Sequence, residues 1–191
     1  MATKKSKKKK TGPTLQPATK PKARKTSVRI RRDPGLIAAC VPYRDCAQKI
    51  IARCEALHPS TKTDCKGFLN AVATEFFGAG FVGNADAIVA FLRDPRNGWS
   101  RTRKRAEAIA QAKAAMFVIA GATSNEMGKA NGHVAVVVDL PLEMKDTPMA
   151  FAGSIDSEAL RIPGRKISST FNATMVHSEQ LDYFYKEPTR P

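Results

Sequence analysis

The spacing of apolar residues changes about halfway along this chain, and this change constrains the fold more than any other feature. Up to residue 114 the apolar side chains recur at three- and four-residue intervals, as in residues 68–76, which is the spacing of one helix face. After residue 116 they form short β-branched or aromatic runs between turn residues, which is typical of strands. Helices followed by strands without alternation predict an α+β domain, with N-terminal helices packed on an antiparallel β-sheet.

We expect four helices and five strands. The predicted helices cover residues 46–56, 65–77, 84–92 and 102–114. Pro59-Ser60-Thr61 is expected to end the first helix, because proline lacks a backbone N–H and clashes with the preceding turn. The predicted strands cover residues 116–120, 134–139, 149–155, 170–176 and 181–186.

Basic residues gather in the first part of the chain. Residues 1–32 hold nine Lys and four Arg but no acid, so they carry +13 of the net charge of +15. This stretch, with its lysine run Lys7–Lys10 and repeated prolines, cannot bury enough apolar surface to fold. We therefore expect residues 1–35 to be a disordered basic tail and residues 36–191 to be one folded domain. The tail is either a solvated leader or an arm that binds a polyanion.

The composition of the folded part excludes several classes of function. The residues after 32 carry only +2, so the basic composition does not indicate nucleic-acid binding by the domain itself. No apolar run approaches the roughly 18 residues of a membrane span, and the N-terminus lacks the apolar stretch of a secretory signal peptide. The spacings of Cys40, Cys46, Cys54 and Cys65 fit no zinc finger or ribbon, so we expect neither a metal nor another cofactor.

Cys65 begins the second predicted helix. The first turn of a helix supplies partial positive charge and free backbone N–H groups, which lower the pKa of a thiol and favour the nucleophilic thiolate. The flanking Asp64, Lys66 and Gly67 are polar or small and would leave the sulfur accessible. A nucleophile at a helix N-terminus is one interpretation, and a buried structural thiol is the other, since free cysteines are among the most buried residues.

His133 begins the strand Gly-His-Val-Ala-Val-Val-Val, where Gly132 lets a neighbouring group approach closely. An imidazole at the end of a sheet can act as the base that takes the proton of a thiol. We expect His58, beside Pro59, and His177, between two strands, to lie at the surface. A cysteine at a helix start and a later histidine at a strand start together predict a Cys65–His133 dyad.

The residues around this pair are similar to known motifs. Residues 64–68 (Asp-Cys-Lys-Gly-Phe) and 131–137 (Asn-Gly-His-Val-Ala-Val-Val) resemble the Asp-Cys-Ser-Gly-Phe and Gly-His-Val patterns of bacterial NlpC-type cell-wall endopeptidases. Further segments match in order and spacing the type VI secretion amidase effectors. These segments are residues 68–73, 83–87, 117–121 and 153–155.

The resemblance covers about residues 42–187 and implies a papain-like cysteine hydrolase. The reaction that it implies is hydrolysis of an amide in the peptide stem of peptidoglycan, in this family the bond between D-glutamate and meso-diaminopimelate. It also implies delivery by a type VI secretion apparatus without a signal peptide, action in the periplasm of a target cell, and a cognate immunity protein that plugs the site. Lys66 departs from the family pattern, because many relatives have serine at this position, which in some of them helps to hold the substrate.

A third group should orient the imidazole of His133. If residues 134–139 pair with residues 149–155 as a hairpin, His133 faces Ser154. A register shift of two residues would instead offer the carbonyl of Ala152. For the oxyanion of the acyl intermediate, the backbone N–H of Cys65 is the natural donor, because the first N–H groups of a helix have no partner within it.

The predicted substrate contacts lie on loops or at helix starts, where each could equally be a cap or a packing residue. They are Asp64, Lys66, Asn84, Asp86 and Trp99. A second hypothesis directs the same dyad at a protein target inside another cell, as a protease or deamidase. A third makes the chain a nucleic-acid binder that acts through its tail, with an inert domain.

Overall fold

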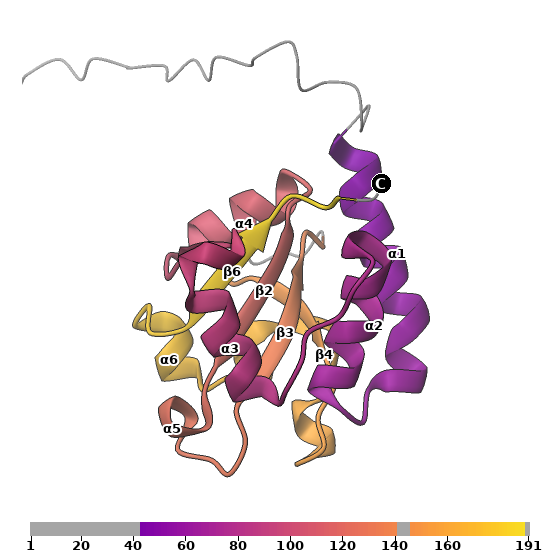
Figure 1. Ribbon diagram of the computed structural model, residues 1–191. Coiled ribbons are helices and arrows are strands. Elements are labelled where there is room, and N and C mark those ends of the chain that lie inside the picture. Colours follow the sequence, from indigo (N-terminus) through magenta and orange to yellow (C-terminus); the bar gives the residue numbers. More distant parts are fainter. Residues whose placement is uncertain (1–42, 141–145, 190–191) are drawn as a thin grey trace, which may run out of the picture. The chain divides into compact units, whose positions relative to one another are not determined.

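A computed structural model of the chain describes residues 43–140 and 146–189 (Figure 1). The predicted basic tail, residues 1–35, lies outside the described residues. The helices are α1 (Tyr43–Thr61), α2 (Cys65–Phe77), α3 (Ala85–Arg93), α4 (Arg105–Lys113), α5 (Ser124–Met127) and α6 (Ala173–His177), with short 3-10 turns η2 (Pro95–Asn97), η3 (Glu158–Leu160) and η4 (Ile167–Ser169). The strands are β1 (Ser100–Thr102), β2 (Phe117–Ala122), β3 (His133–Val138), β4 (Met149–Ala152), β5 (Ile162–Lys166) and β6 (Asp182–Lys186).

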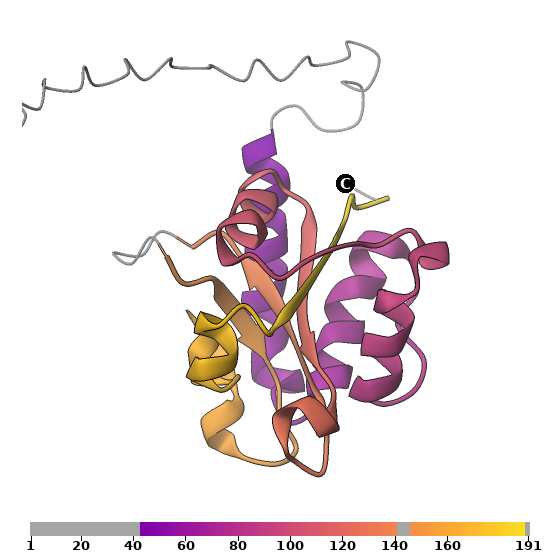
Figure 2. The ribbon, with the colours of Figure 1, turned by 90° about the vertical axis from the view of Figure 1, so that its left-hand side faces the viewer.

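The six strands form one antiparallel sheet in the order β1-β6-β2-β3-β4-β5. Helices cover both faces, so every residue of β2 and β3 is buried. Alternate side chains of these strands enter two cores, one shared with α1, α2 and α3 and the other with α4 and α6. Figure 2 shows α2 and α3 on one side of the central strands and α6 on the other. The predicted α+β class, with helices packed on an antiparallel sheet, is confirmed.

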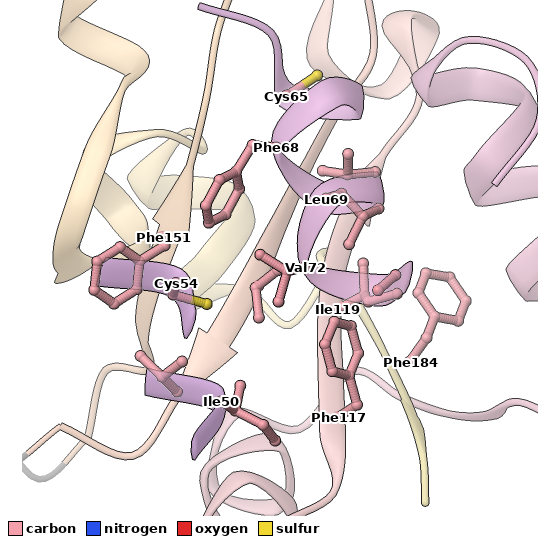
Figure 3. Packing of buried hydrophobic residues seen from close by; sticks show 14 of the residues in the cluster. Ile50, Cys54, Cys65, Phe68, Leu69, Val72, Phe117, Ile119, Phe151 and Phe184 are labelled. Carbon is pink, nitrogen blue, oxygen red and sulfur yellow. The ribbon is translucent and has the colours of Figure 1, made fainter. Parts of the chain in front are cut away.

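Helix α2 covers the predicted residues and positions the candidate nucleophile at its start. Asp64 caps it, because its carboxylate accepts a hydrogen bond from the backbone N–H of Lys66. Gly78 ends the helix in the left-handed conformation at φ 76°. Figure 3 shows the buried side of the helix, where Phe68, Leu69 and Val72 pack toward the sheet while Cys65 stands at the helix end.

Helix α1 runs five residues past its predicted end, to Thr61, although Pro59 lies inside it. The hydroxyls of Ser60 and Thr61 both donate to the carbonyl of Leu57, and the N–H of Lys62 donates to the carbonyl of His58. These bonds continue the last turn in spite of the proline. As a result His58 is buried rather than at the surface, and its Nε2 bonds the carbonyl of Ala152 at 3.0 Å.

The predicted strand at residues 170–176 is wrong. Its β-branched and aromatic composition favoured a strand, but Asn172 accepts a hydrogen bond from the N–H of Thr174 and caps α6 instead. Strands β1 and β5 were not predicted, because β1 has three residues and β5 contains Pro163 and Gly164. Among the described residues, no helix has the length and apolar character that crossing a membrane requires.

Candidate active site

The candidate site is a pocket of about 280 Å³ where four chain segments meet. Residues 64–66 begin α2 and residues 83–85 begin α3, whereas residues 131–133 lead into β3 and residues 154–156 follow β4. The pocket therefore brings Cys65 and His133 together, as the sequence predicted, although 68 residues of sequence separate them. Cys65 is 8% exposed and His133 4% exposed, so only one edge of each side chain is accessible to a substrate.

His133 has a polar partner that holds its ring. The Nε2 atom lies 2.6 Å from the hydroxyl oxygen of Thr170, and that hydroxyl donates its only proton to the carbonyl of Leu160 at 2.8 Å. Thr170 must then accept from His133, so Nε2 carries the ring proton and Nδ1 is unprotonated. The ring of Phe171 contacts the imidazole edge-on at 5.2 Å and further restricts it. The site thus holds an imidazole whose unprotonated nitrogen is Nδ1.

Burial keeps both members of the pair uncharged in the free protein. It raises the pKa of the Cys65 thiol, while the backbone N–H groups of Val134, Lys66 and Cys65 itself act in the opposite direction. Burial lowers the pKa of His133 to about 4, with a further decrease from Lys129 and an opposing effect of Asp156. At neutral pH the pocket is therefore lined by a thiol and a neutral imidazole, which is the state that a general-base mechanism needs.

The side chain that hydrogen-bonds the imidazole of His133 is Thr170, whereas the structure gives the predicted candidates, Ser154 and the carbonyl of Ala152, other partners. The predicted hairpin register is present, since Val136 pairs with Phe151. However, Ser154 binds elsewhere: its N–H donates to the carbonyl of Lys62, and its hydroxyl accepts from the backbone N–H groups of the two residues that follow Ile155. The carbonyl of Ala152 accepts from His58.

Two glycines let the strands carrying the site approach their neighbours closely. A Cβ at Gly153 would lie 2.5 Å from the backbone oxygen of Asp64, so this strand end packs directly against the loop that precedes Cys65. A Cβ at Gly132 would lie within 2.1 Å of a carboxylate oxygen of Asp86. Cys65 and His133 are therefore each positioned by backbone contacts that only glycine permits.

The predicted substrate contacts separate into two groups. Asp64, Lys66 and Asn84 line the pocket, and Asp64 and Asn84 also cap α2 and α3. Asp86 lies outside the pocket lining and bonds the N–H and the hydroxyl of Ser124, which fixes the segment before β3. Trp99 also lies outside the pocket lining and is a packing residue, 9% exposed, against Phe77 and Phe81.

Sequence reasoning missed two features of the site. Thr170 was assigned to a strand, and no local pattern marks a threonine as the partner of a histidine 37 residues earlier. Asp156 was not considered, although it lines the pocket and accepts a hydrogen bond from Asn131 at 2.9 Å, which joins the two loops beside His133. In the part of the chain that the structure describes, no three His, Cys, Asp or Glu side chains form a group suited to a metal ion.

Comparison with known proteins identifies the family. No protein-family model matches the chain. The peptidoglycan amidase Tse1 of Pseudomonas aeruginosa is 34% identical over 124 residues, which is 64% of this chain and 75% of the amidase. With that identity over three quarters of a known amidase, the chain belongs to the family of the peptidoglycan amidase Tse1, and its resemblance to the type VI secretion amidase effectors is confirmed.

Proposed function

We propose that this protein is a peptidoglycan amidase that hydrolyses an amide of the peptide stem by a Cys65–His133 thiol mechanism. One observation carries the proposal: a cysteine at a helix start and a neutral histidine at a strand start line one pocket. The 34% identity to a peptidoglycan amidase supports the choice of substrate. Within the stem we propose the bond between D-glutamate and meso-diaminopimelate, which is the bond that the family resemblance implies.

The proposed chemistry assigns a step to each of these polar groups. Nδ1 of His133 takes the thiol proton as the sulfur of Cys65 attacks the carbonyl carbon, and the backbone N–H of Cys65 stabilises the oxyanion. His133 then gives that proton to the leaving amine, which departs and leaves a thioester. Water, deprotonated by His133, attacks the thioester, and His133 returns this proton to the departing sulfur, so that the new carboxylic acid and the free thiol are released; the acid then ionises in solution. Thr170 keeps Nε2 protonated throughout.

The test uses purified Gram-negative sacculi and mass analysis of the released muropeptides. We expect new stem fragments with a free amine on diaminopimelate, and none from Cys65→Ala. Cys54→Ala is the matched control, because Cys54 is fully buried in α1, outside the pocket lining, and its loss should leave cleavage intact. Unchanged muropeptides with an intact Cys65 would contradict the proposal.

Delivery by a type VI secretion apparatus, action in the periplasm and a cognate immunity protein complete the proposal. Family membership supports each of them. The site of action is tested by producing the protein in the cytoplasm or in the periplasm of a host bacterium. Lysis confined to the periplasmic form supports the cell wall as target, whereas toxicity of the cytoplasmic form favours the alternative of a protease or deamidase acting on a protein.

A further inference from the structure

A second pocket, of about 310 Å³, lies next to the active-site pocket and has no part in the proposed reaction. It is lined by residues 127 and 129 at the end of α5, by residue 160 of η3, and by residues 169–172 between η4 and α6.

The two pockets share a wall. His133 lines the active-site pocket and Thr170 lines the second pocket, and the hydrogen bond of 2.6 Å between Nε2 and the hydroxyl joins these side chains. Phe171 also lines the second pocket, and its ring contacts the imidazole with 5.2 Å between the centroids. Only one layer of side chains therefore separates a ligand in the second pocket from the imidazole.

Two loops also lead from one pocket to the other. Residues 127–133 and residues 154–160 each begin in the lining of one pocket and end in the lining of the other. The side chains of Asn131 and Asp156 join these loops by a hydrogen bond of 2.9 Å. Each residue of an extended peptide adds at most about 3.6 Å, so a substrate held at Cys65 needs only a few further residues to reach the second pocket.

The described residues that line the second pocket supply hydrogen-bond donors and a cation but no carboxylate. The exposed ammonium of Lys129 forms no ion pair within residues 46–140 and 146–189. The side-chain oxygen of Asn172 accepts from the N–H of Thr174, which leaves its amide N–H groups as donors, and Ser169 adds an exposed hydroxyl. This set of groups fits a carboxylate, unlike the active-site pocket, which two carboxylates line.

The rest of the lining favours a short aliphatic group beside that carboxylate. Met127 and Leu160 are half-buried, so each presents part of an apolar side chain to the second pocket. Apolar walls with a few polar groups are typical of sites that bind small ligands or the end of a chain. A terminal alanine has this combination, because its carboxylate is attached to the carbon that carries its methyl group.

We propose that the second pocket binds a carboxylate of the peptide stem beyond the scissile amide, with Lys129 as the cation that pairs with it. This rests on the proposed function. On the amine side of the bond, diaminopimelate is followed by D-alanine, whose terminal carboxylate is free in a stem without a cross-link. In a cross-linked stem this D-alanine is joined to a second stem, which brings carboxylates of its own. Both sources present the same group to the ammonium.

The experiment measures kcat/KM on three substrates. One is the tetrapeptide stem L-Ala-γ-D-Glu-diaminopimelate-D-Ala with a free terminal carboxylate, one is the same tetrapeptide with a terminal amide, and one is the cross-linked dimer of two tetrapeptide stems. We expect the wild type to cleave the amide about tenfold less efficiently, mainly through KM, because a charge-assisted hydrogen bond is lost. Efficient cleavage of the free acid identifies the stem's own terminus as the ligand, whereas efficient cleavage of the dimer alone identifies the second stem.

Three variants assign this preference to Lys129. Lys129→Met keeps the length but not the charge, so it should cleave all three substrates with similar kcat/KM, while Lys129→Arg should retain the preference. Lys62→Met is the matched control, because it removes an exposed lysine outside both pocket linings and should keep the wild-type preference. Lys129 also lowers the pKa of His133, but this effect is common to the three substrates and cancels in their comparison.

The outcomes separate this inference from the proposed function. Equal kcat/KM of the wild type on all three substrates, an unchanged preference in Lys129→Met, or a loss of preference in Lys62→Met would overturn the role of the second pocket and leave the amidase activity standing. If the wild type cleaves none of them, the proposed function fails.

A binding measurement then decides the inference alone. Cys65→Ala is titrated with N-acetyl-D-alanine and with N-acetyl-D-alaninamide, and the backbone amide signals of Ser169 and Asn172 are followed by NMR. Shifts that require both the carboxylate of the ligand and Lys129 support the inference. Absence of such shifts, or equal shifts with the amide, overturns it.

Discussion

At the scale of single residues, the candidate site depends on which nitrogen of His133 carries the proton. A histidine can serve as a base only through its unprotonated nitrogen. The hydrogen-bond partner of Nε2 determines which of the two ring nitrogens of His133 is unprotonated. Thr170 is 2% exposed and bridges the imidazole to the carbonyl of Leu160. A single buried hydroxyl therefore fixes both the orientation and the tautomer of the His133 imidazole.

Replacing Thr170 by valine tests this role. Thr170→Val keeps the shape but leaves a buried N–H of His133 without an acceptor, which costs about 1–3 kcal/mol. We expect kcat for stem-peptide hydrolysis to fall about tenfold to a hundredfold with little change in KM. Thr170→Ser should restore most of the rate, because it returns the hydroxyl. Wild-type kcat in Thr170→Val would show that the ring needs no such partner.

The burial of His133 also predicts how stability depends on pH. Its pKa is lowered to about 4 in the folded protein from an ordinary 6.5, so the unfolded chain binds protons first as the pH falls. The stability that the folded protein gains by keeping His133 neutral is fully present above pH 6.5. It is lost as the pH falls from about 6.5 to 4, and the free energy of unfolding then decreases by up to about 3 kcal/mol. Burial lowers the pKa of His58 as well, which adds in the same direction.

Urea unfolding at pH 7.5 and pH 4.5 measures this loss. His133→Gln removes the titrating ring, so its stability should decrease less between the two pH values than that of the wild type. An equal decrease in both proteins would mean that His133 is not held neutral by the fold.

At the scale of elements, the contact between the end of β4 and the loop before α2 positions Cys65. Gly153→Ala would bring a Cβ 2.5 Å from the oxygen and 2.8 Å from the carbonyl carbon of Asp64, and backbone atoms cannot rotate away. We expect a loss of about 1–3 kcal/mol in the free energy of unfolding and a decrease in sacculus hydrolysis, because Cys65 follows directly. Unfolding curves and rates equal to those of the wild type would contradict this placement.

Elements also differ in how far the sequence could predict them. The predicted bounds of helix α2 are correct, because its cap, its apolar spacing and its terminal glycine lie within the helix or directly next to it in sequence. The predicted end of α1 was wrong, because the hydroxyl groups of Ser60 and Thr61 and the hydrogen bond of His58 to Ala152 stabilise the last turn in spite of Pro59. That Cys65 and His133 lie at one site could be predicted from local patterns together with the family resemblance, and both line the pocket. Thr170 could not, because its role arises only when η4 is folded against the start of β3.

At the scale of the whole molecule, one buried carboxylate joins elements that are distant in sequence. Asp182, at the start of β6, is 1% exposed and accepts hydrogen bonds from Arg93, Arg101 and Arg103 at 2.7–2.8 Å. Arg93 also binds Glu126 of α5. This network connects α3, β1, β6 and α5, so its loss should decrease the free energy of unfolding of the domain.

Replacing Asp182 by asparagine tests that expectation. Asp182→Asn keeps the volume but removes the charge that three arginines share, and leaves those cations close together. We expect the free energy of unfolding to decrease by about 2–3 kcal/mol, less than for a fully buried pair because the arginines are partly exposed. Glu158→Gln is the matched control, since it breaks an exposed pair with Arg161 and should change stability by no more than about 0.5 kcal/mol. Similar urea midpoints for the two variants would mean that the buried Asp182 stabilises the protein no more than a surface ion pair does. A lower midpoint in Asp182→Asn alone would show that this carboxylate stabilises the fold by joining the three arginines.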